Sequence, residues 1–279
     1  MEFTSRDDTL LQEAKPIVKF CVLASGSSGN AALLVTQNTR ILIDAGLSMK
    51  ELRRRMESIG EDLARIDAVL ITHEHSDHVA GLPVLGRAAS GKNKLRAVFY
   101  LSRLTAPSID WGETRPARVE EFQAGAAFQI GDIEVQSFSI PHDAADPVGF
   151  ALDAQGVRIA IATDLGYIPA SVKFHLRRTD LLLLEANHDL DMLKVGPYPW
   201  SVKQRVMSRV GHLSNSAMAD FLIEDLDSST HRLVLGHLSE HNNHPAIVQV
   251  MASQSLEQRG LRTALTIAEQ RRPSEVFLF

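Results

Sequence analysis

The hydrophobic positions of this chain form short runs that are typical of β-strands, separated by turns rich in Gly, Asp and Asn. Two pairs of runs meet across tight turns, at residues 131–132 and 154–156, and each pair predicts a hairpin. The run at 181–186 is apolar almost throughout and predicts a fully buried strand. The strands expected from these runs are residues 17–24, 31–35, 40–44, 68–71, 95–100, 128–130, 133–140, 148–153, 157–162, 181–186, 232–235, 263–267 and 276–278.

Helical patterns lie between these strands. Ser48 can cap a helix that runs to about residue 59, where Gly60 ends it. Further helices are expected from about residue 79 onwards and at 201–209, 214–225 and 245–259. The mixture predicts an α/β fold in which two sheets pack face to face with helices outside. Residues 1–15 are polar and predict a loose tail, whereas no linker divides residues 16–279, which we expect to form a single domain.

Several of the expected strands end in a histidine or an aspartate. The pattern recurs at His73, His142, Asp164, His188 and His237. Strand ends are where layered α/β folds build their sites, so these side chains are candidates for one shared site.

The densest group of such residues is His73-Glu74-His75-Ser76-Asp77-His78, directly after the apolar run 68–71. On an extended segment His73, His75 and Asp77 would share one face, and His78 would reach the other side at the turn. Imidazole and carboxylate together suit zinc, and manganese also accepts them. The pattern therefore predicts a metal site with room for two ions. A polar loop of solvated histidines is the alternative.

Composition narrows the picture. The chain has 279 residues and a net charge of −5, so it carries no overall basic field that would indicate nucleic acid, although local Arg or Lys clusters and bound dications could supply one. The single cysteine, Cys21, excludes an intramolecular disulfide and a cysteine-built zinc site. No export signal or long apolar run is present, so we expect a cytoplasmic protein that does not bind or span a membrane.

The segment 73–78 resembles the HxHxDH signature of the metallo-β-lactamase-fold superfamily. His142, Asp164 and His237 follow in the order and approximate spacing of that superfamily's later motifs. The stretches 23–30, 44–46, 184–189, 211–215 and 236–243 are similar to the YycJ/WalJ-like branch, bacterial proteins regarded as DNA exonucleases. The resemblance covers residues 17–279. It implies a metallo-β-lactamase-like αββα four-layer sandwich, with the site in a cleft at the sheet edges.

The resemblance also implies a ligand set for two divalent metal ions, Zn²⁺ or Mn²⁺. The first ion would be bound by His73, His75 and His142, the second by Asp77, His78 and His237, with Asp164 between them. Two such ions can hold a phosphodiester and share a bridging hydroxide as the nucleophile. Taken singly, His142 could equally be a turn residue after Pro141, and Asp164 a helix cap.

Other residues are candidates for catalysis. Asp77 could orient the hydroxide as well as bind metal. His212 and His188 could each supply a proton to the leaving oxygen, although core or capping roles compete, since Ser214 would make a good helix cap.

Candidate substrate contacts lie in two places. In the turn at 25–30, Ser25, Ser27, Ser28 and Asn30 could form an anion-binding nest, or the turn could simply be a tight connection that needs glycine. Basic side chains beside Tyr198 and Trp200 could follow a nucleic-acid backbone, or could be a solvated helix face; they are Lys203, Arg205 and Arg209. Arg53, Arg54 and Arg55 indicate a solvated helix face, with a phosphate contact as the alternative.

The function that the resemblance implies is a dinuclear metal-dependent phosphodiester hydrolase acting on nucleic acid, a 5′-to-3′ exonuclease for which DNA is favoured over RNA. A second possibility keeps the fold but hydrolyses a small molecule, such as a cyclic phosphodiester, a thioester or a lactone. A di-iron redox protein is disfavoured, because such proteins carry a carboxylate where His75 stands. A non-catalytic scaffold is disfavoured because all seven ligand positions are kept. The oligomeric state stays open, with a homodimer as one alternative.

Overall fold

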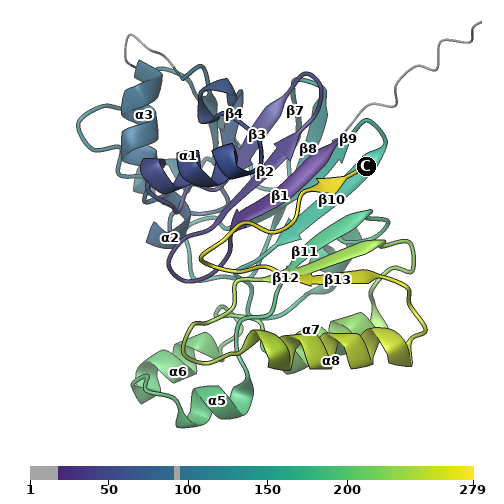
Figure 1. The fold of residues 1–279 in the computed structure, drawn as a ribbon. Coiled ribbons are helices and arrows are strands. Elements are labelled where there is room, and N and C mark those ends of the chain that lie inside the picture. Colours follow the sequence, from purple (N-terminus) through teal and green to yellow (C-terminus); the bar gives the residue numbers. More distant parts are fainter. Residues whose placement is uncertain (1–17, 91–94) are drawn as a thin grey trace, which may run out of the picture.

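The computed structural model describes residues 18–90 and 95–279, which form two seven-stranded sheets packed face to face (Figure 1). The first sheet consists, in spatial order, of β14 (Phe277–Leu278), β1 (Lys19–Ala24), β2 (Ala31–Val35), β3 (Arg40–Ile43), β4 (Ala68–Leu70), β5 (Val98–Ser102) and β6 (Val119–Phe122). The second consists of β13 (Ala264–Ile267), β12 (Arg232–Gly236), β11 (Leu181–Glu185), β10 (Val157–Ala162), β9 (Val148–Ala154), β8 (Ile133–Ser139) and β7 (Ala127–Ile130).

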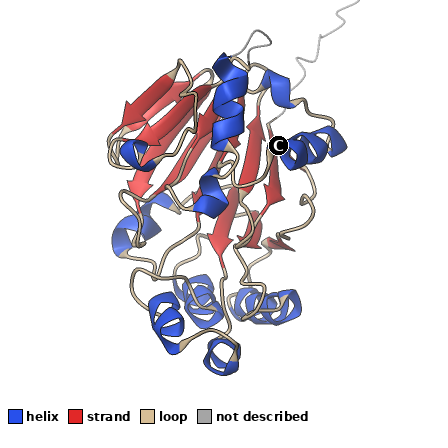
Figure 2. Ribbon diagram, turned by 90° about the vertical axis from the view of Figure 1, so that its left-hand side faces the viewer, coloured by secondary structure: helices blue, strands red, loops and turns tan. Residues whose placement is uncertain are grey.

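Helices cover the outer faces of both sheets (Figures 1 and 2). On the first sheet they are α1 (Met49–Ser58), α2 (Ser76–Val79) and α3 (Leu82–Ser90), with the short 3₁₀ turns η1 (Leu63–Arg65) and η2 (Ala106–Ser108). On the side of the second sheet they are α4 (Ala170–His175), α5 (Leu190–Val195), α6 (Trp200–Val206), α7 (Asn215–Glu224) and α8 (Pro245–Gln258). The expected four-layer αββα arrangement is confirmed.

Three hydrophobic clusters hold these layers together, and β1 shows how. Phe20 and Val22 face the second sheet, whereas Cys21 and Leu23 face outward, towards the helices of the first sheet. A strand buried on both faces reads as a continuous apolar run, because both alternating sets of side chains are covered. Cys21 is therefore a core residue, and burial raises the pKa of its thiol.

Strand β11 is also buried on both faces, which accounts for its apolar sequence. Leu181 and Leu183 lie between the sheets, while Leu182 and Leu184 pack in the cluster that includes Met218 of α7. Each fully buried leucine contributes about 1.5–3 kcal/mol relative to an exposed one, so neither face of this strand could carry a polar residue cheaply.

Most elements expected from the sequence appear within a residue or two of their predicted bounds. The expected helix at 48–59 is α1, and its cap is Ser48, whose side chain accepts a hydrogen bond from the backbone N–H of Glu51. The tail expected at residues 1–15, and the first residue of the expected strand 17–24, lie outside the described residues. None of the helices in the described part of the chain combines the length and apolar composition needed to cross a bilayer.

Besides the short 3₁₀ turns η1 and η2, three elements were not expected. The strand β6 has the sequence VEEF and lies at a sheet edge with its two glutamates exposed, so it has no buried alternation to reveal it. The helices α4 and α5 are only six residues long, too short for a periodic pattern.

The expectation that residues 73–77 are extended is wrong for Ser76 and Asp77, and the helix expected from near residue 79 starts earlier. Helix α2 begins at Ser76 with His75 as its cap residue. Asp77 and His78 therefore lie on a helical turn, where consecutive side chains point about 100° apart rather than to opposite faces.

The two sheets place the ends of their parallel strands at the same side of the molecule. Strands β3, β4, β5 and β6 are parallel in the first sheet, as are β10, β11, β12 and β13 in the second. Three residues within two positions of the ends of such strands have a positive backbone φ: Asp44 (58°), Asp164 (60°) and His237 (55°). Residues other than glycine rarely adopt this conformation, which costs of order 1–3 kcal/mol and clusters at functional sites.

Candidate metal centre

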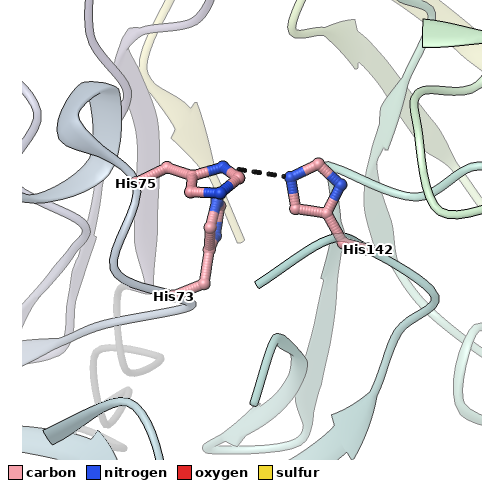
Figure 3. A group of neighbouring side chains, drawn as sticks. All are labelled: His73, His75 and His142. Carbon is pink, nitrogen blue, oxygen red and sulfur yellow. Dashed lines mark hydrogen bonds between the residues drawn. The ribbon is translucent and has the colours of Figure 1, made fainter. Parts of the chain in front are cut away.

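A first group of ligand atoms comes from His73, His75 and His142. His73 and His75 lie on the segment between β4 and α2, and His142 follows β8 of the other sheet. Their ring nitrogens converge, so that one atom from each lies within 4.8 Å of the others. His142 Nε2 lies 3.2 Å from His75 Nδ1 across the gap between the two sheets (Figure 3).

A second group consists of Asp77, His78 and His237, which also lie within 4.8 Å of one another. Asp77 Oδ2 lies 3.3 Å from His237 Nε2 and 3.5 Å from His78 Nε2. The first two residues come from α2 and the third from the end of β12, so this group too joins the sheets.

Asp164 lies between the two groups. Its Oδ1 atom is 3.3 Å from His237 Nε2 and 3.9 Å from His142 Nε2. Its Oδ2 atom is 3.2 Å from His78 Nε2. Asp164 is 2% exposed, so it can serve only the atoms of this cluster.

Each of four histidines has its Nδ1 atom engaged by an acceptor, which leaves Nε2 facing inward. His78 Nδ1 lies 2.8 Å from Asp44 Oδ2, and His237 Nδ1 lies 2.9 Å from Glu185 Oε1. His73 Nδ1 lies 3.0 Å from Thr72 Oγ1, and His142 Nδ1 donates to the backbone oxygen of Gly211 at 3.1 Å. Outer partners of this kind fix the tautomer and ring orientation of histidines that bind metals.

The donor set fits divalent metal ions. His73 Nε2 and Asp164 Oδ2 are buried without a hydrogen-bond partner among the described residues, a costly arrangement unless a cation takes them up. The 3.2–3.3 Å separations also match the spacing of roughly 3.3 Å that a tetrahedral ion with ligands at about 2.0–2.1 Å imposes.

Burial and opposite charges shift the pKa values of the cluster residues in different directions. Burial lowers the pKa of His73 and His142, which keeps these imidazoles neutral and able to bind metal. Burial opposes charge on His78 and His237 too, but Asp164 and neighbouring carboxylates outweigh it and hold both pKa values well above the usual range. Although burial acts in the opposite direction, the facing histidines lower the pKa of Asp164. Asp164 thus retains its charge, and protonated His78 and His237 balance it when no ion is bound; a bound cation would take over that role.

Gly46 allows α2 to approach the first sheet. A Cβ atom on Gly46 would lie 1.6 Å from the backbone oxygen of Asp77, and no rearrangement of a flexible side chain could relieve this contact. The same oxygen accepts a hydrogen bond from the backbone N–H of Asn30 at 2.7 Å. The close contact with Gly46 and the hydrogen bond from Asn30 therefore fix the position of the Asp77 backbone beside the cluster.

The contacts of the turn at residues 25–30 favour the alternative of a tight connection that supports the cluster over an open anion nest. Five of its six backbone N–H groups already donate to acceptors within the described chain. Ser25 Oγ accepts from the backbone N–H of His237 at 2.7 Å, and Asn30 Nδ2 donates to Asp77 Oδ2 at 3.1 Å. Ser28 is bonded to Gln270, and only the exposed Ser27 is left to solvent.

His212 is well placed to act beside the cluster. Its Nδ1–H donates to Glu185 Oε1 at 2.8 Å, and its ring stacks on that of His237 with centroids 5.3 Å apart. The side chain keeps 23% of its surface exposed, so a substrate can reach it. Burial lowers its pKa, but the adjacent Glu185 carboxylate outweighs this and leaves the pKa above the usual value.

His188 is a poor candidate for a proton donor. Its side chain is buried at 1% exposure, and burial lowers its pKa to about 4, so the imidazole is neutral near pH 7. The structure favours the alternative core role, at a bridge between His188 and Ser214, and Ser214 is the cap of α7.

Two residues of the site, Glu185 and Asp44, were not singled out individually from the sequence. Glu185 is fully buried and accepts from His212, from His237 and from the backbone N–H groups of Leu165 and Leu213. These bonds hold its pKa at about 2 despite its burial. The signal was present: a charged residue that ends a fully apolar strand is a buried charge that needs partners.

The predicted basic residues have different surroundings. Lys203 is buried and donates to the backbone oxygen of Lys194 at 2.7 Å, so it cannot contact a substrate. Arg205 and Arg209 are exposed. On α1, Arg55 is also buried and donates to the backbone oxygens of Leu23 and Gln270, which corrects the expectation of a solvated face there.

Two sheets packed face to face, with a histidine- and carboxylate-rich cluster joining their edges, define a hydrolase of the metallo-β-lactamase fold, a class whose members use divalent metal ions. Residues 39–238 match the family model described as the β-lactamase superfamily domain. The chain belongs to the β-lactamase superfamily, and within it to the family that includes the YycJ and WalJ proteins.

Two relatives and one solved structure show the extent of the similarity. The chain is 35% identical to the "Exodeoxyribonuclease YycJ" of Bacillus anthracis over 86% of this chain and 90% of that protein. It is also 35% identical to the "Exodeoxyribonuclease WalJ" of Streptococcus pneumoniae serotype 2, over 87% of this chain and 90% of that protein. The metallo-β-lactamase fold protein YhfI from Bacillus subtilis has the same fold, with a TM-score of 0.72 at 17% identity, over 95% of this chain and 100% of YhfI.

Proposed function

We propose that this protein is a phosphodiester hydrolase acting on nucleic acid, a 5′-to-3′ DNA exonuclease with two divalent ions bound by the seven residues predicted from the sequence. The observation that carries the proposal is the coincidence of two things. Two ligand groups flank Asp164, and the chain is 35% identical, over most of its length, to two relatives named exodeoxyribonucleases.

The ligand groups divide the work in this proposal. His73, His75 and His142 would hold the first ion, and Asp77, His78 and His237 the second, with Asp164 facing both. Divalent ions in such a centre polarise the phosphodiester and activate the attacking water. Zinc and manganese both accept this mixture of imidazole and carboxylate ligands.

His212 would deliver the proton that the leaving oxygen needs. Glu185 holds its Nδ1–H, so the ring is oriented with Nε2 as the atom available to the substrate. The same carboxylate oxygen accepts from His237 Nδ1, so one rigid, buried group positions both a ligand and the proton donor. Glu74 has no comparable role, because its Oε1 accepts from the backbone N–H of Ala145 at 2.7 Å.

The experiment that tests the proposal is hydrolysis of 5′-end-labelled double-stranded DNA, with and without added manganese. We expect release of labelled mononucleotides that requires the metal and stops with a chelator. In the His75→Ala protein the rate should fall more than about a hundredfold, since even loss of an outer partner of a metal ligand costs 10–100-fold.

The competing function is hydrolysis of a small molecule by the same centre. Robust cleavage of a simple phosphodiester or a thioester, with no release of nucleotides from DNA of any end structure, would replace the proposal. If the protein released labelled mononucleotides first from DNA labelled at its 3′ end, the nuclease activity would stand but its polarity would be reversed.

A further inference from the structure

The segment from Arg205 to His212 is built onto the metal centre. The backbone N–H of Asp143 donates to the oxygen of Val210 at 3.0 Å, next to the bond between His142 and Gly211. The backbone of Arg209 also packs closely against Gly166, two residues after Asp164. A Cβ atom on Gly166 would lie 2.4 Å from the backbone of Arg209. Side chains that project from this segment therefore stand at a fixed place beside the candidate ligands.

Two arginines project from this segment. Arg205 has 62% of its side chain exposed and forms an ion pair with Asp143. The guanidinium of Arg209 lies over the ring of Tyr167, 4.1 Å from the ring centre, and the residue is exposed. An arginine stacked on an aromatic ring is held in one orientation while its N–H groups stay free to bind phosphate.

An exposed aromatic side chain lies at the start of α6, the helix that also carries Arg205. Trp200, the first residue of α6, is 62% exposed, and Val195 and Val202 near it are 86% and 38% exposed. The other tryptophan, Trp111, is buried in the core. Figure 1 shows α5 and α6 together at the end of the molecule below α2, outside the layer formed by the two sheets.

We infer that Arg205, Arg209 and Trp200 form a binding surface for a single-stranded stretch of nucleic acid that leads into the metal centre. The arginines would bind backbone phosphates close to the scissile bond, and Trp200 would stack on a base several nucleotides away. The inference rests on the proposed function, and it names the part of the protein that holds a polymer rather than a small phosphodiester.

The combination favours nucleic acid over a protein partner. Base stacking and phosphate contacts need an aromatic face and cations on one part of the surface. Here the exposed Trp200 shares α6 with Arg205, and Arg209 follows that helix beside the candidate metal ligands. The net charge of −5 makes such a local cationic site more necessary, because the overall field repels a polyanion.

Binding can be measured directly with the metal-loaded protein and a phosphorothioate dT12 oligomer that resists hydrolysis. We expect the oligomer to quench the fluorescence of Trp200, while buried Trp111 supplies an unquenched remainder. Trp200→Ala lacks this fluorophore, so its affinity is measured by the anisotropy of a dye-labelled oligomer; binding should weaken by about tenfold to a hundredfold, the range for loss of one stacked base. Arg209→Ala should reduce the slope of log K against log salt concentration by about 0.7, the value for one phosphate contact on a single strand.

Arg53→Ala is the matched control, because Arg53 is an exposed arginine on α1, over the other sheet. It should leave both the affinity and the salt slope unchanged. Arg209→Ala and Trp200→Ala decide the test, since Arg205 also holds Asp143 beside His142 and its loss could disturb the centre.

A kinetic comparison tests the binding surface separately from the proposed function. For Arg209→Ala, kcat/KM on unmodified dT12 should fall at least tenfold more than kcat/KM on bis(p-nitrophenyl) phosphate, and the loss should appear in KM. If the wild-type protein binds and cleaves dT12 while both deciding variants behave like Arg53→Ala, the surface is wrong and the proposed function stands. If the wild-type protein neither binds nor cleaves dT12, the surface is wrong, and hydrolysis of 5′-end-labelled double-stranded DNA then decides the proposed function separately.

Discussion

Replacing Asp164 by Ala is expected to lower metal-dependent turnover by more than about a hundredfold. Among the described residues, Asp164 is the one carboxylate whose two oxygens face both ligand groups, at 3.2–3.9 Å from His78, His237 and His142. Its removal takes away the negative charge that faces these histidines. Loss of even an outer partner of a metal ligand costs 10–100-fold in metal affinity or activity. The measurement is turnover of a phosphodiester across a range of metal concentrations.

Asp191→Ala is the control for this experiment, because Asp191 has 91% of its side chain exposed on α5 and contacts none of the candidate ligands. Asp164→Asn tests the charge separately from the shape. If Asp164→Ala retained full turnover at low metal concentration, the assignment of Asp164 to the centre would be refuted.

Removal of the metal is expected to lower the melting temperature by about 10 °C. The cluster holds Asp44, Asp164 and Glu185 in the protein interior, and a buried charge without its partner is strongly destabilising. An ion present at about a thousand times its dissociation constant stabilises the folded state by about 4.1 kcal/mol. At roughly 2–4 °C per kcal/mol, this predicts a shift that calorimetry resolves easily.

The shift should be restored by zinc or manganese and should depend on the concentration of the ion. The His75→Ala protein should start from a lower melting temperature and respond less to added metal. An identical melting temperature with chelator and with saturating metal would contradict the view that this cluster is a metal centre.

Many strand bounds could be predicted from the sequence, because continuous apolar runs end abruptly at turn residues. Strands such as β2 and β10 match their predicted bounds residue for residue, since both are bounded by turns and covered on both faces. Four of the seven candidate ligands, His73, His142, Asp164 and His237, stand out because a histidine or aspartate at the end of a buried strand contrasts with its apolar background. The other three stand out as part of the dense segment 73–78, and the resemblance joined all seven into one ligand set. Their convergence depended on the resemblance, since spacing along a chain does not specify which strand ends meet.

Outer partners were harder to predict. Glu185 and Asp44 also end strands, but nothing in the sequence links Glu185 to two histidines 27 and 52 residues further along the chain. The sequence left two interpretations of the turn at 25–30 open for the same reason: its N–H groups are taken up by residues as distant as Glu269 and Gln270. The helical position of Asp77 was missed because α2 is a single turn of four residues.

The central claim is that the seven residues bind two divalent ions in each chain. The most direct test is the metal content of the purified protein after equilibration with zinc or manganese and removal of loosely bound ions, measured by elemental analysis against protein concentration. We predict two ions per chain in the wild-type protein and a loss of at least one in each of His75→Ala and His237→Ala, which remove ligands from the first and second groups respectively. A wild-type protein that binds no ion, or variants that bind as many ions as the wild type, would contradict the account.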